Sequence, residues 1–150
     1  MKLNIKLLRE NSKLPRKAHP TDAGYDLFVS EIKKKSLFKV HYKLGFSVDF
    51  NESQYAEVPP RSSVHKRFMW MANSFGVIDN GYKGEWQAVF YRIPFISRPY
   101  KVGDACCQAI FKYMQDDQLE FREVDSVGSS DRGDGGFGHT DEKFKEDENL

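Results

Sequence analysis

Apolar and polar residues alternate over short stretches of this 150-residue chain, the pattern of strands with one buried face. One such stretch covers residues 3–7, and a second, unbroken one runs from Leu44 to Phe50. No long stretch has helical periodicity, so at most one short helix fits. Further strands are predicted, in chain order, at residues 55–58, 68–71, 86–90, 109–114 and 119–124.

The segments between these strands carry turn formers. Residues 11–24 and 93–100 each contain two prolines, so the first is predicted as a loop and the second as a loop or an edge. The run Lys33-Lys34-Lys35 is expected to be a solvated turn. Many short strands separated by turns are typical of an all-β sandwich or barrel-like fold.

The composition changes after Val127. Residues 128–140 are rich in glycine and residues 141–150 are mostly charged, so neither segment has much to bury. We therefore expect one β domain over residues 1–127, followed by a flexible arm and tail over residues 128–150. With 14% aromatic residues, the chain has ample material for a packed core.

Bulk properties exclude several classes. A net charge of +1 argues against a general nucleic-acid binder, which would present a strongly basic face. No apolar run is long enough to span a bilayer, and the first residues lack the apolar region of a signal peptide. Cys106 and Cys107 are adjacent, and neighbouring cysteines rarely pair without strain. We expect reduced thiols and a cytoplasmic protein.

Asn80-Gly81 is the strongest local signal in the chain. It predicts a two-residue hairpin turn, whose central residues both accept positive φ. The flanking residues Asp79 and Tyr82 would then pair across the strands and project to one face. A carboxylate beside an aromatic ring suits a small ring-bearing substrate. The alternative is an ordinary surface turn with Asp79 as turn former.

The glycine-rich arm is the second signal. Closely spaced glycines allow successive backbone N–H groups to converge on an anion such as phosphate. Arg132 adds a planar, charged fork suited to phosphate oxygens, and Thr140 adds a hydroxyl. Phe137 could stack on a base, a contact typically worth about 1–3 kcal/mol. A flexible linker is the alternative, but it leaves Arg132 and Phe137 without a role.

Three further segments contain residues suited to phosphate or metal. Arg61-Ser62-Ser63 follows Pro60 and is a plausible phosphate cradle, Gln108 interrupts an apolar stretch and needs a polar partner there, and Asp26 is a possible Mg²⁺ ligand. Each segment is also consistent with an ordinary turn. The four histidines are scattered without ligand spacing, and no Walker loop or dinucleotide fingerprint is present.

Taken in order from Ala23 to Thr140, these five segments resemble the five motifs of the trimeric dUTP diphosphatase (dUTPase) family. The ordered set, which ends in Arg-Gly-x-Gly-Gly-Phe-Gly, is highly specific. The resemblance implies a compact β-barrel or jelly-roll-like subunit of the β-clip type. It also implies a homotrimer with active sites at subunit interfaces, and Mg²⁺-dependent hydrolysis of dUTP to dUMP and pyrophosphate, which limits uracil incorporation into DNA.

The resemblance also implies residue roles. Asp79 would be the general base that deprotonates the water attacking the α-phosphorus, a contribution typically worth about 10²–10⁴-fold. Tyr82 would pack on the deoxyribose and exclude a ribose 2′-OH. The uracil edge would be read by Asn73 and by the backbone around Val77 and Ile78, with Gln87 nearby.

The remaining implied contacts concern the phosphates. Asp26 would hold Mg²⁺ through water. The phosphates would be bound by Arg61, Ser62, Ser63 and Gln108. From a neighbouring subunit, the arm would close over the γ-phosphate and the base with Arg132, Phe137, Gly138 and Thr140. His139 stands where the family usually has serine, so one phosphate hydroxyl is missing.

Two alternatives remain open. The related dCTP deaminases carry a glutamate ten residues beyond the hairpin aspartate, whereas this chain has Val89, which argues against deamination. The second alternative is a non-catalytic regulator that binds nucleotide, since some members of the family are reported to signal by binding other proteins.

Overall fold

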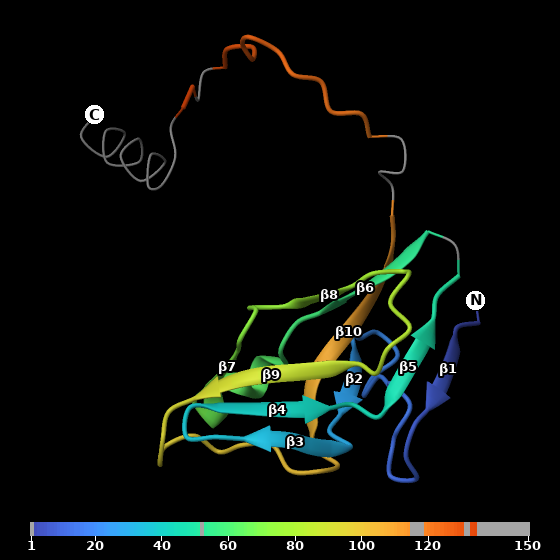
Figure 1. Cartoon of the computed structure of the whole chain (residues 1–150), viewed down its shortest axis with the longest axis vertical. Coiled ribbons are helices and arrows are strands. Elements are labelled where there is room, and N and C mark those ends of the chain that lie inside the picture. Colours follow the sequence, from blue (N-terminus) through green and yellow to red (C-terminus); the bar gives the residue numbers. More distant parts are fainter. Residues whose placement is uncertain (1, 52, 115–118, 131–132, 135–150) are drawn as a thin grey trace. The chain divides into compact units, whose positions relative to one another are not determined.

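The computed structural model describes residues 2–51, 53–114, 119–130 and 133–134. The chain divides into two compact units, residues 1–117 and 118–150. Among the described residues, the first unit is built almost entirely of antiparallel strands, which confirms the all-β prediction (Figure 1). Its elements are β1 (Asn4–Leu7), β2 (Tyr25–Phe28), β3 (Glu31–Lys35), β4 (Lys39–Lys43), β5 (Phe46–Asp49), β6 (Gln54–Val58), the 3-10 helix η1 (Ser62–Arg67), β7 (Met69–Met71), β8 (Gly76–Ile78), β9 (Gln87–Arg92) and β10 (Ala105–Tyr113).

The strands form three sheets around one apolar core. One four-stranded sheet has the order β2-β10-β6-β8, the other has the order β3-β4-β9-β7, and β1 pairs with β5 (Figure 1). The two four-stranded sheets contribute alternating buried residues to the same core cluster. Trp86 lies near its centre, with ring centroids 5.1 Å from Phe46 and 6.3 Å from Phe111. In the first sheet, β2 and β8 are the two edge strands, and this order determines where the functional residues lie.

The predicted hairpin around Asn80-Gly81 is wrong. The chain does turn there, since the Tyr82 N–H donates to the Asp79 carbonyl at 3.0 Å, but neither Asn80 nor Gly81 has a positive φ. The flanking strands belong to different sheets, because β8 pairs with β6 whereas β9 pairs with β4 and β7. The Asn80 side chain explains part of this outcome. It donates to the carbonyls of Asn51 and Gln54 at 2.7 and 3.0 Å and ties the turn to β6.

Two other local predictions are also wrong. The lysine run is not a turn but part of β3, an edge strand, where exposed lysines discourage pairing with another chain. Residues 119–124 form no strand, and Phe121 is 89% exposed. A strand requires a neighbour for its backbone groups, and none is present among the described residues.

Strand β4 was not predicted. Its signal was the alternation of Val40 and Tyr42 with polar residues, and both side chains are fully buried. Gly45, with a φ of +79°, separates β4 from β5 and shortens the strand predicted over residues 44–50. The other predicted strands and the loop at residues 93–100 are confirmed, and within the part of the chain that the structure describes η1 is the one short helix, as the pattern allowed.

Cys106 and Cys107 are free, as predicted, and both side chains are fully buried. The hydrogen bond between the two thiols, together with burial, raises the pKa of Cys107 well above its usual range, so this thiol stays protonated. Among the described residues, no helix has the length and apolar character needed to cross a bilayer.

Candidate active site

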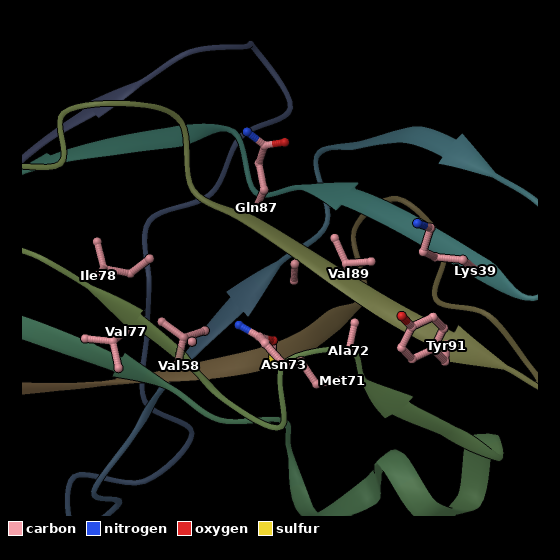
Figure 2. A pocket seen from close by; sticks show the side chains of 12 residues that line it. Lys39, Val58, Met71, Ala72, Asn73, Val77, Ile78, Gln87, Val89 and Tyr91 are labelled. Atoms are coloured by element: carbon pink, nitrogen blue, oxygen red, sulfur yellow. The ribbon is translucent and has the colours of Figure 1, made fainter.

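One cleft is lined by four of the residues that were expected to contact the base. We call it the base cleft. Its volume is about 390 Å³, within the range of small-molecule sites. The cleft lies between β8, β9 and the β7–β8 turn, and Figure 2 shows side chains from all three directed around it. Its lining includes the predicted residues Asn73, Val77, Ile78 and Gln87.

The wall formed by β8 carries polar backbone groups. Because β8 pairs only with β6 and is the edge of its sheet, the N–H and C=O groups along its outer side have no strand partner among the described residues. Asn73 approaches this strand, since its Nδ2 lies 3.6 Å from where a Cβ on Gly76 would be. Ser74, in the left-handed region with a φ of 61°, makes the tight turn that brings them together. The cleft can therefore offer backbone groups and an amide to the polar edge of a flat ring.

Asp79 and Tyr82 follow β8 but do not line the base cleft. The Asp79 side chain is exposed and has no hydrogen bond or ion pair with the described residues. Tyr82 is 41% exposed and its hydroxyl donates to the Glu85 carbonyl at 2.9 Å. Its ring covers Gly84, where an added Cβ would come within 2.6 Å of the phenol oxygen. The absence of a side chain on Gly84 thus leaves space for the ring, whereas the Asp79 carboxylate is exposed to solvent.

Residues expected to bind phosphate and metal line a second cleft of about 240 Å³, which we call the anion cleft. It lies at the opposite edge of the sheet β2-β10-β6-β8 from the base cleft, where β2 is the edge strand. Its lining includes Asp26, Arg61, Ser62 and Gln108 from the predicted set, together with Ala18, Asp22, Ala23 and Gly24. Ser63 lies in η1 but does not line the cleft.

Backbone pairing brings these residues together. Gln108 of β10 lies opposite Asp26 of β2, and a bridge between Pro60 and Cys107 places the segment after β6 against β10. The Gln108 amide donates to the Pro60 carbonyl at 3.3 Å, which supplies the partner that the sequence analysis required. Gly24 leaves the space for this amide, because a Cβ there would lie 2.3 Å from Gln108 Oε1.

The charges in the anion cleft are arranged around one ion pair. Arg61 Nε lies 2.8 Å from Asp26 Oδ1. A guanidinium has five N–H donors, so Arg61 keeps several for a phosphate. The described residues contain no cluster of three acidic, histidine or cysteine side chains that could enclose a metal. Asp26 alone fits a Mg²⁺ ion that takes most of its ligands from water and phosphate oxygens.

The base cleft and the anion cleft share no lining residue. One lies at the β8 edge of the sheet β2-β10-β6-β8 and the other at the β2 edge. Four predicted residues of the arm, Arg132, Phe137, Gly138 and Thr140, lie outside the described residues.

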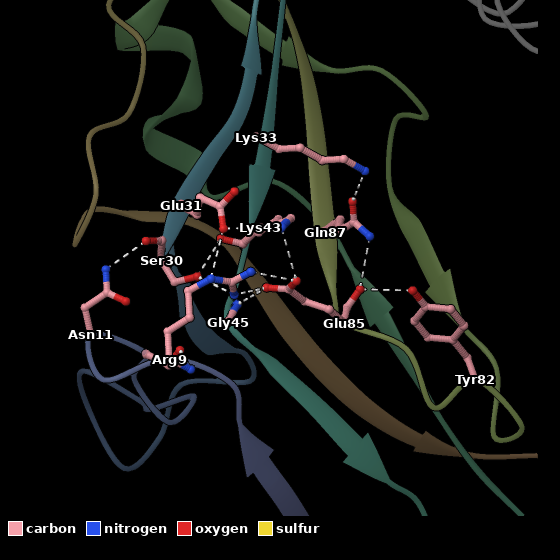
Figure 3. A network of polar contacts seen from close by, with 11 residues as sticks. Arg9, Asn11, Ser30, Glu31, Lys33, Lys43, Gly45, Tyr82, Glu85 and Gln87 are labelled. Atoms are coloured by element: carbon pink, nitrogen blue, oxygen red, sulfur yellow. Dashed lines mark hydrogen bonds and ion pairs between the residues drawn. The ribbon is translucent and has the colours of Figure 1, made fainter.

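An ion-pair cluster beside the base cleft was missed by the sequence analysis. Arg9 binds the Glu85 carboxylate through both terminal nitrogens and contacts Glu31 at 2.9 Å (Figure 3). Burial would raise the pKa of Glu85, but the hydrogen bonds and charge contacts with Arg9 and the Gly45 N–H outweigh burial and lower it. Arg9 and Glu85 are 76 positions apart, so no local pattern signals their contact.

Comparison with known proteins identifies the family. Residues 10–141 match the family model described as dUTPase. The chain belongs to the dUTPase family. It is 36% identical over 140 residues to the deoxyuridine 5'-triphosphate nucleotidohydrolase of Clostridium tetani, an alignment that covers 92% of this chain and 95% of that relative.

Solved dUTPase structures share the fold. A Staphylococcus bacteriophage 80alpha dUTPase with dUPNHPP superposes with a TM-score of 0.77 and 24% identity, covering 92% of this chain and 97% of the other. A mutant dUTPase from phage phi11 of S. aureus, described for the coordination of a structural Mg(II) ion, has a TM-score of 0.66 and 23% identity over 84% of this chain and 98% of the other. At these identities, the likeness confirms the fold of the β domain.

Proposed function

We propose that this chain hydrolyses dUTP to dUMP and pyrophosphate. The observation that carries the proposal is the base cleft, in which Asn73, an open strand edge and Gln87 surround a space suited to a uracil ring. Membership of the dUTPase family and the likeness to a named deoxyuridine 5'-triphosphate nucleotidohydrolase support the same activity.

Selection of uracil follows from polar matching at the cleft wall. The β8 backbone and the Asn73 amide pair with the uracil edge, which presents one N–H donor between two carbonyl acceptors. Cytosine reverses part of this pattern and would leave buried polar groups unmatched, a mismatch that can reach about 10⁴–10⁵-fold in discrimination. Tyr82 packs on the deoxyribose and leaves no room for a 2′-OH.

Asp79 acts as the general base. Its exposed carboxylate, without a partner among the described residues, accepts the proton of the water that attacks the α-phosphorus. Asp79 directly follows β8, the strand proposed to hold the base, and this position supports its role. The bond between the α-phosphorus and the bridging oxygen then breaks, and pyrophosphate leaves.

The phosphates bind in the anion cleft. Arg61 donates N–H groups of its guanidinium, while Ser62 and the Gln108 amide add neutral donors. Ser63, which lies in η1 outside the cleft lining, would add a further hydroxyl. Mg²⁺, held to Asp26 through water, would offset the negative charge of the triphosphate. Asp26 and Arg61 also orient each other through their ion pair.

The complete site forms between copies of the chain. The base cleft and the anion cleft lie at opposite edges of one sheet and share no residue, so one nucleotide is bound by the base cleft of one subunit and the anion cleft of the next. A closed ring of three subunits gives each cleft a partner, which is a homotrimer with three equivalent sites. Arg132, Phe137, Gly138 and Thr140 of a neighbouring arm close over the nucleotide and exclude water. The free, buried cysteines fit an intracellular enzyme.

A substrate panel tests the proposed function. Pyrophosphate release from dUTP, dCTP, dTTP and UTP is measured on the purified protein in the presence of Mg²⁺. We expect turnover of dUTP and far less of the other three. Equal turnover of all four would refute the matching argument, and no turnover of dUTP would refute the function.

A further inference from the structure

Eight residues connect the end of β8 to the start of β9, and they contain both Asp79 and Tyr82. At one end of this connection, the Tyr82 N–H donates to the Asp79 carbonyl. At the other end, the Trp86 carbonyl accepts the Leu44 N–H, and the Trp86 N–H donates to the Phe46 carbonyl. Between these points, the connection depends on side chains. The Lys83–Asp49 pair is more than half exposed at both partners and is therefore worth little.

Glu85 is held within this connection by several side-chain contacts. Its side chain is 15% exposed and accepts hydrogen bonds from both terminal nitrogens of Arg9 and from the Gly45 N–H, the last at 3.1 Å. Two parallel contacts between a guanidinium and a carboxylate fix geometry as well as distance. Arg9 is itself anchored on β3 through Glu31 at 2.9 Å.

The Glu85 backbone carbonyl is where two nucleotide-site residues attach. It accepts the Tyr82 hydroxyl at 2.9 Å and the Gln87 amide at 3.4 Å (Figure 3). Gln87 in turn accepts from Lys33 at 3.4 Å through its own carbonyl oxygen, which fixes which end of the amide points toward the connection. A shift of Glu85 would therefore move a residue on the sugar side and a residue of the base cleft together.

We propose that Arg9 is a positioning residue for the nucleotide site, because through Glu85 it fixes the carbonyl that holds Tyr82 and Gln87. This inference rests on the proposed function. Arg9 does not touch the nucleotide and takes no part in the chemical step. Its effect is on how well the sugar and the base fit, and hence on the preference for deoxyribose.

The test compares the full-length variants Arg9→Met, Arg9→Lys and Glu85→Gln with the unaltered protein. We expect Arg9→Met to raise the KM for dUTP about tenfold, with kcat within about twofold, because the lost contact serves binding rather than chemistry. The ratio of kcat/KM for dUTP over UTP should fall several-fold, since a displaced Tyr82 admits a 2′-OH. Arg9→Lys should recover part of both effects, as a lysine makes one contact where arginine makes two.

A double-mutant cycle identifies the route of the effect. If Arg9 acts through Glu85, then Arg9→Met adds little to the KM of Glu85→Gln. Lys112→Met, which removes an exposed ion pair with Glu57 at 2.9 Å, is the matched control and should leave KM and the dUTP preference unchanged. Thermal unfolding of every variant is measured in parallel, and the kinetics are recorded well below each transition.

The outcomes separate the two proposals. Absence of dUTP turnover in the unaltered protein would refute the proposed function. If the unaltered protein turns over dUTP normally, and the Arg9→Met variant unfolds at a lower temperature but keeps its KM and dUTP preference, then Arg9 has only a structural role. That result would overturn the inference. Fully additive effects of Arg9→Met and Glu85→Gln would also overturn it.

Discussion

Gly24→Ala tests the anion cleft with the smallest possible change. The added methyl would lie 2.3 Å from Gln108 Oε1, 3.0 Å from its Cδ and 3.2 Å from its Cβ. All three distances are shorter than ordinary contacts, so the Gln108 side chain has to rotate away. Gly24 has no positive φ, and an alanine therefore introduces no backbone strain of its own.

The size of the effect follows from the two hydrogen bonds that Gln108 would lose. Loss of the 3.3 Å bond to the Pro60 carbonyl costs stability of about 1 kcal/mol. A hydrogen bond from a neutral amide to a charged phosphate oxygen is worth about 1.5–3 kcal/mol. Its loss should lower kcat/KM for dUTP by about 10- to 150-fold.

The assay is pyrophosphate release from dUTP, with circular dichroism to confirm the β fold. Binding of deoxyuridine, which carries no phosphate, should stay within about twofold of the unaltered protein because the base cleft lies at the other edge of the sheet. In a Gln108→Ala background, Gly24→Ala should cost no further activity. An unchanged kcat/KM in Gly24→Ala, or an equal loss in both backgrounds, would refute the assignment of Gln108 to the phosphates.

Three other predictions concern the core and the chemical step. Tyr42→Phe should lower the free energy of unfolding in urea by about 1–3 kcal/mol, because the Tyr42 hydroxyl accepts the buried Tyr100 N–H at 2.9 Å, whereas Tyr100→Phe should be neutral or stabilising, since the Tyr100 hydroxyl has no partner among the described residues; equal losses in both variants would contradict this. Burial raises the pKa of Tyr100 to about 12, so folding stability does not depend on the ionisation of this phenol below its ordinary pKa of about 10 and falls as the pH rises from there toward 12, where only the unfolded chain releases the proton. Urea unfolding between pH 9 and 11 should show a smaller loss in Tyr100→Phe, and an identical pH profile in both proteins would count against it. Asp79→Asn should retain nucleotide binding but lose about 10²–10⁴-fold in kcat, measured by single-turnover kinetics, and an undiminished rate would remove Asp79 from its role as base.

The sequence predicted which residues belong to the base cleft and to the anion cleft better than it predicted how they are arranged. Asn73, Val77, Ile78 and Gln87 were assigned to one function, and they do line one cleft. The common orientation of Asp79 and Tyr82, in contrast, was inferred from a two-stranded hairpin that the structure does not contain, because β8 pairs with β6 instead of with β9. Which strands pair depends on packing between segments that are distant in the sequence, whereas the Asn80-Gly81 turn signal reports only local preference.

Contacts between distant segments had no signal in the sequence. Lys33-Lys34-Lys35 was assigned to a turn because charge is common in loops, but charge is also what protects an edge strand. The contact between Arg9 and Glu85 depends on how the segment after β1 packs beside β9, and a single sequence carries no periodicity that reports it. The anion cleft likewise required the order β2-β10-β6, which places Asp26 and Gln108 opposite each other.

Mixing two inactive variants tests the central claim, that one nucleotide is bound by the base cleft of one subunit and the anion cleft of another. Asp79→Asn removes the proposed general base, which directly follows the β8 strand of the base cleft. Arg61→Gln impairs the anion cleft, while the glutamine can still donate a hydrogen bond to Asp26. The two proteins are unfolded, combined in equal amounts, refolded together and assayed for pyrophosphate release from dUTP. Random assembly leaves about a quarter of the sites with Asp79 from one subunit and Arg61 from the next, so about a quarter of the unaltered activity should return. Activity no higher than the sum of the two separate variants would contradict the account.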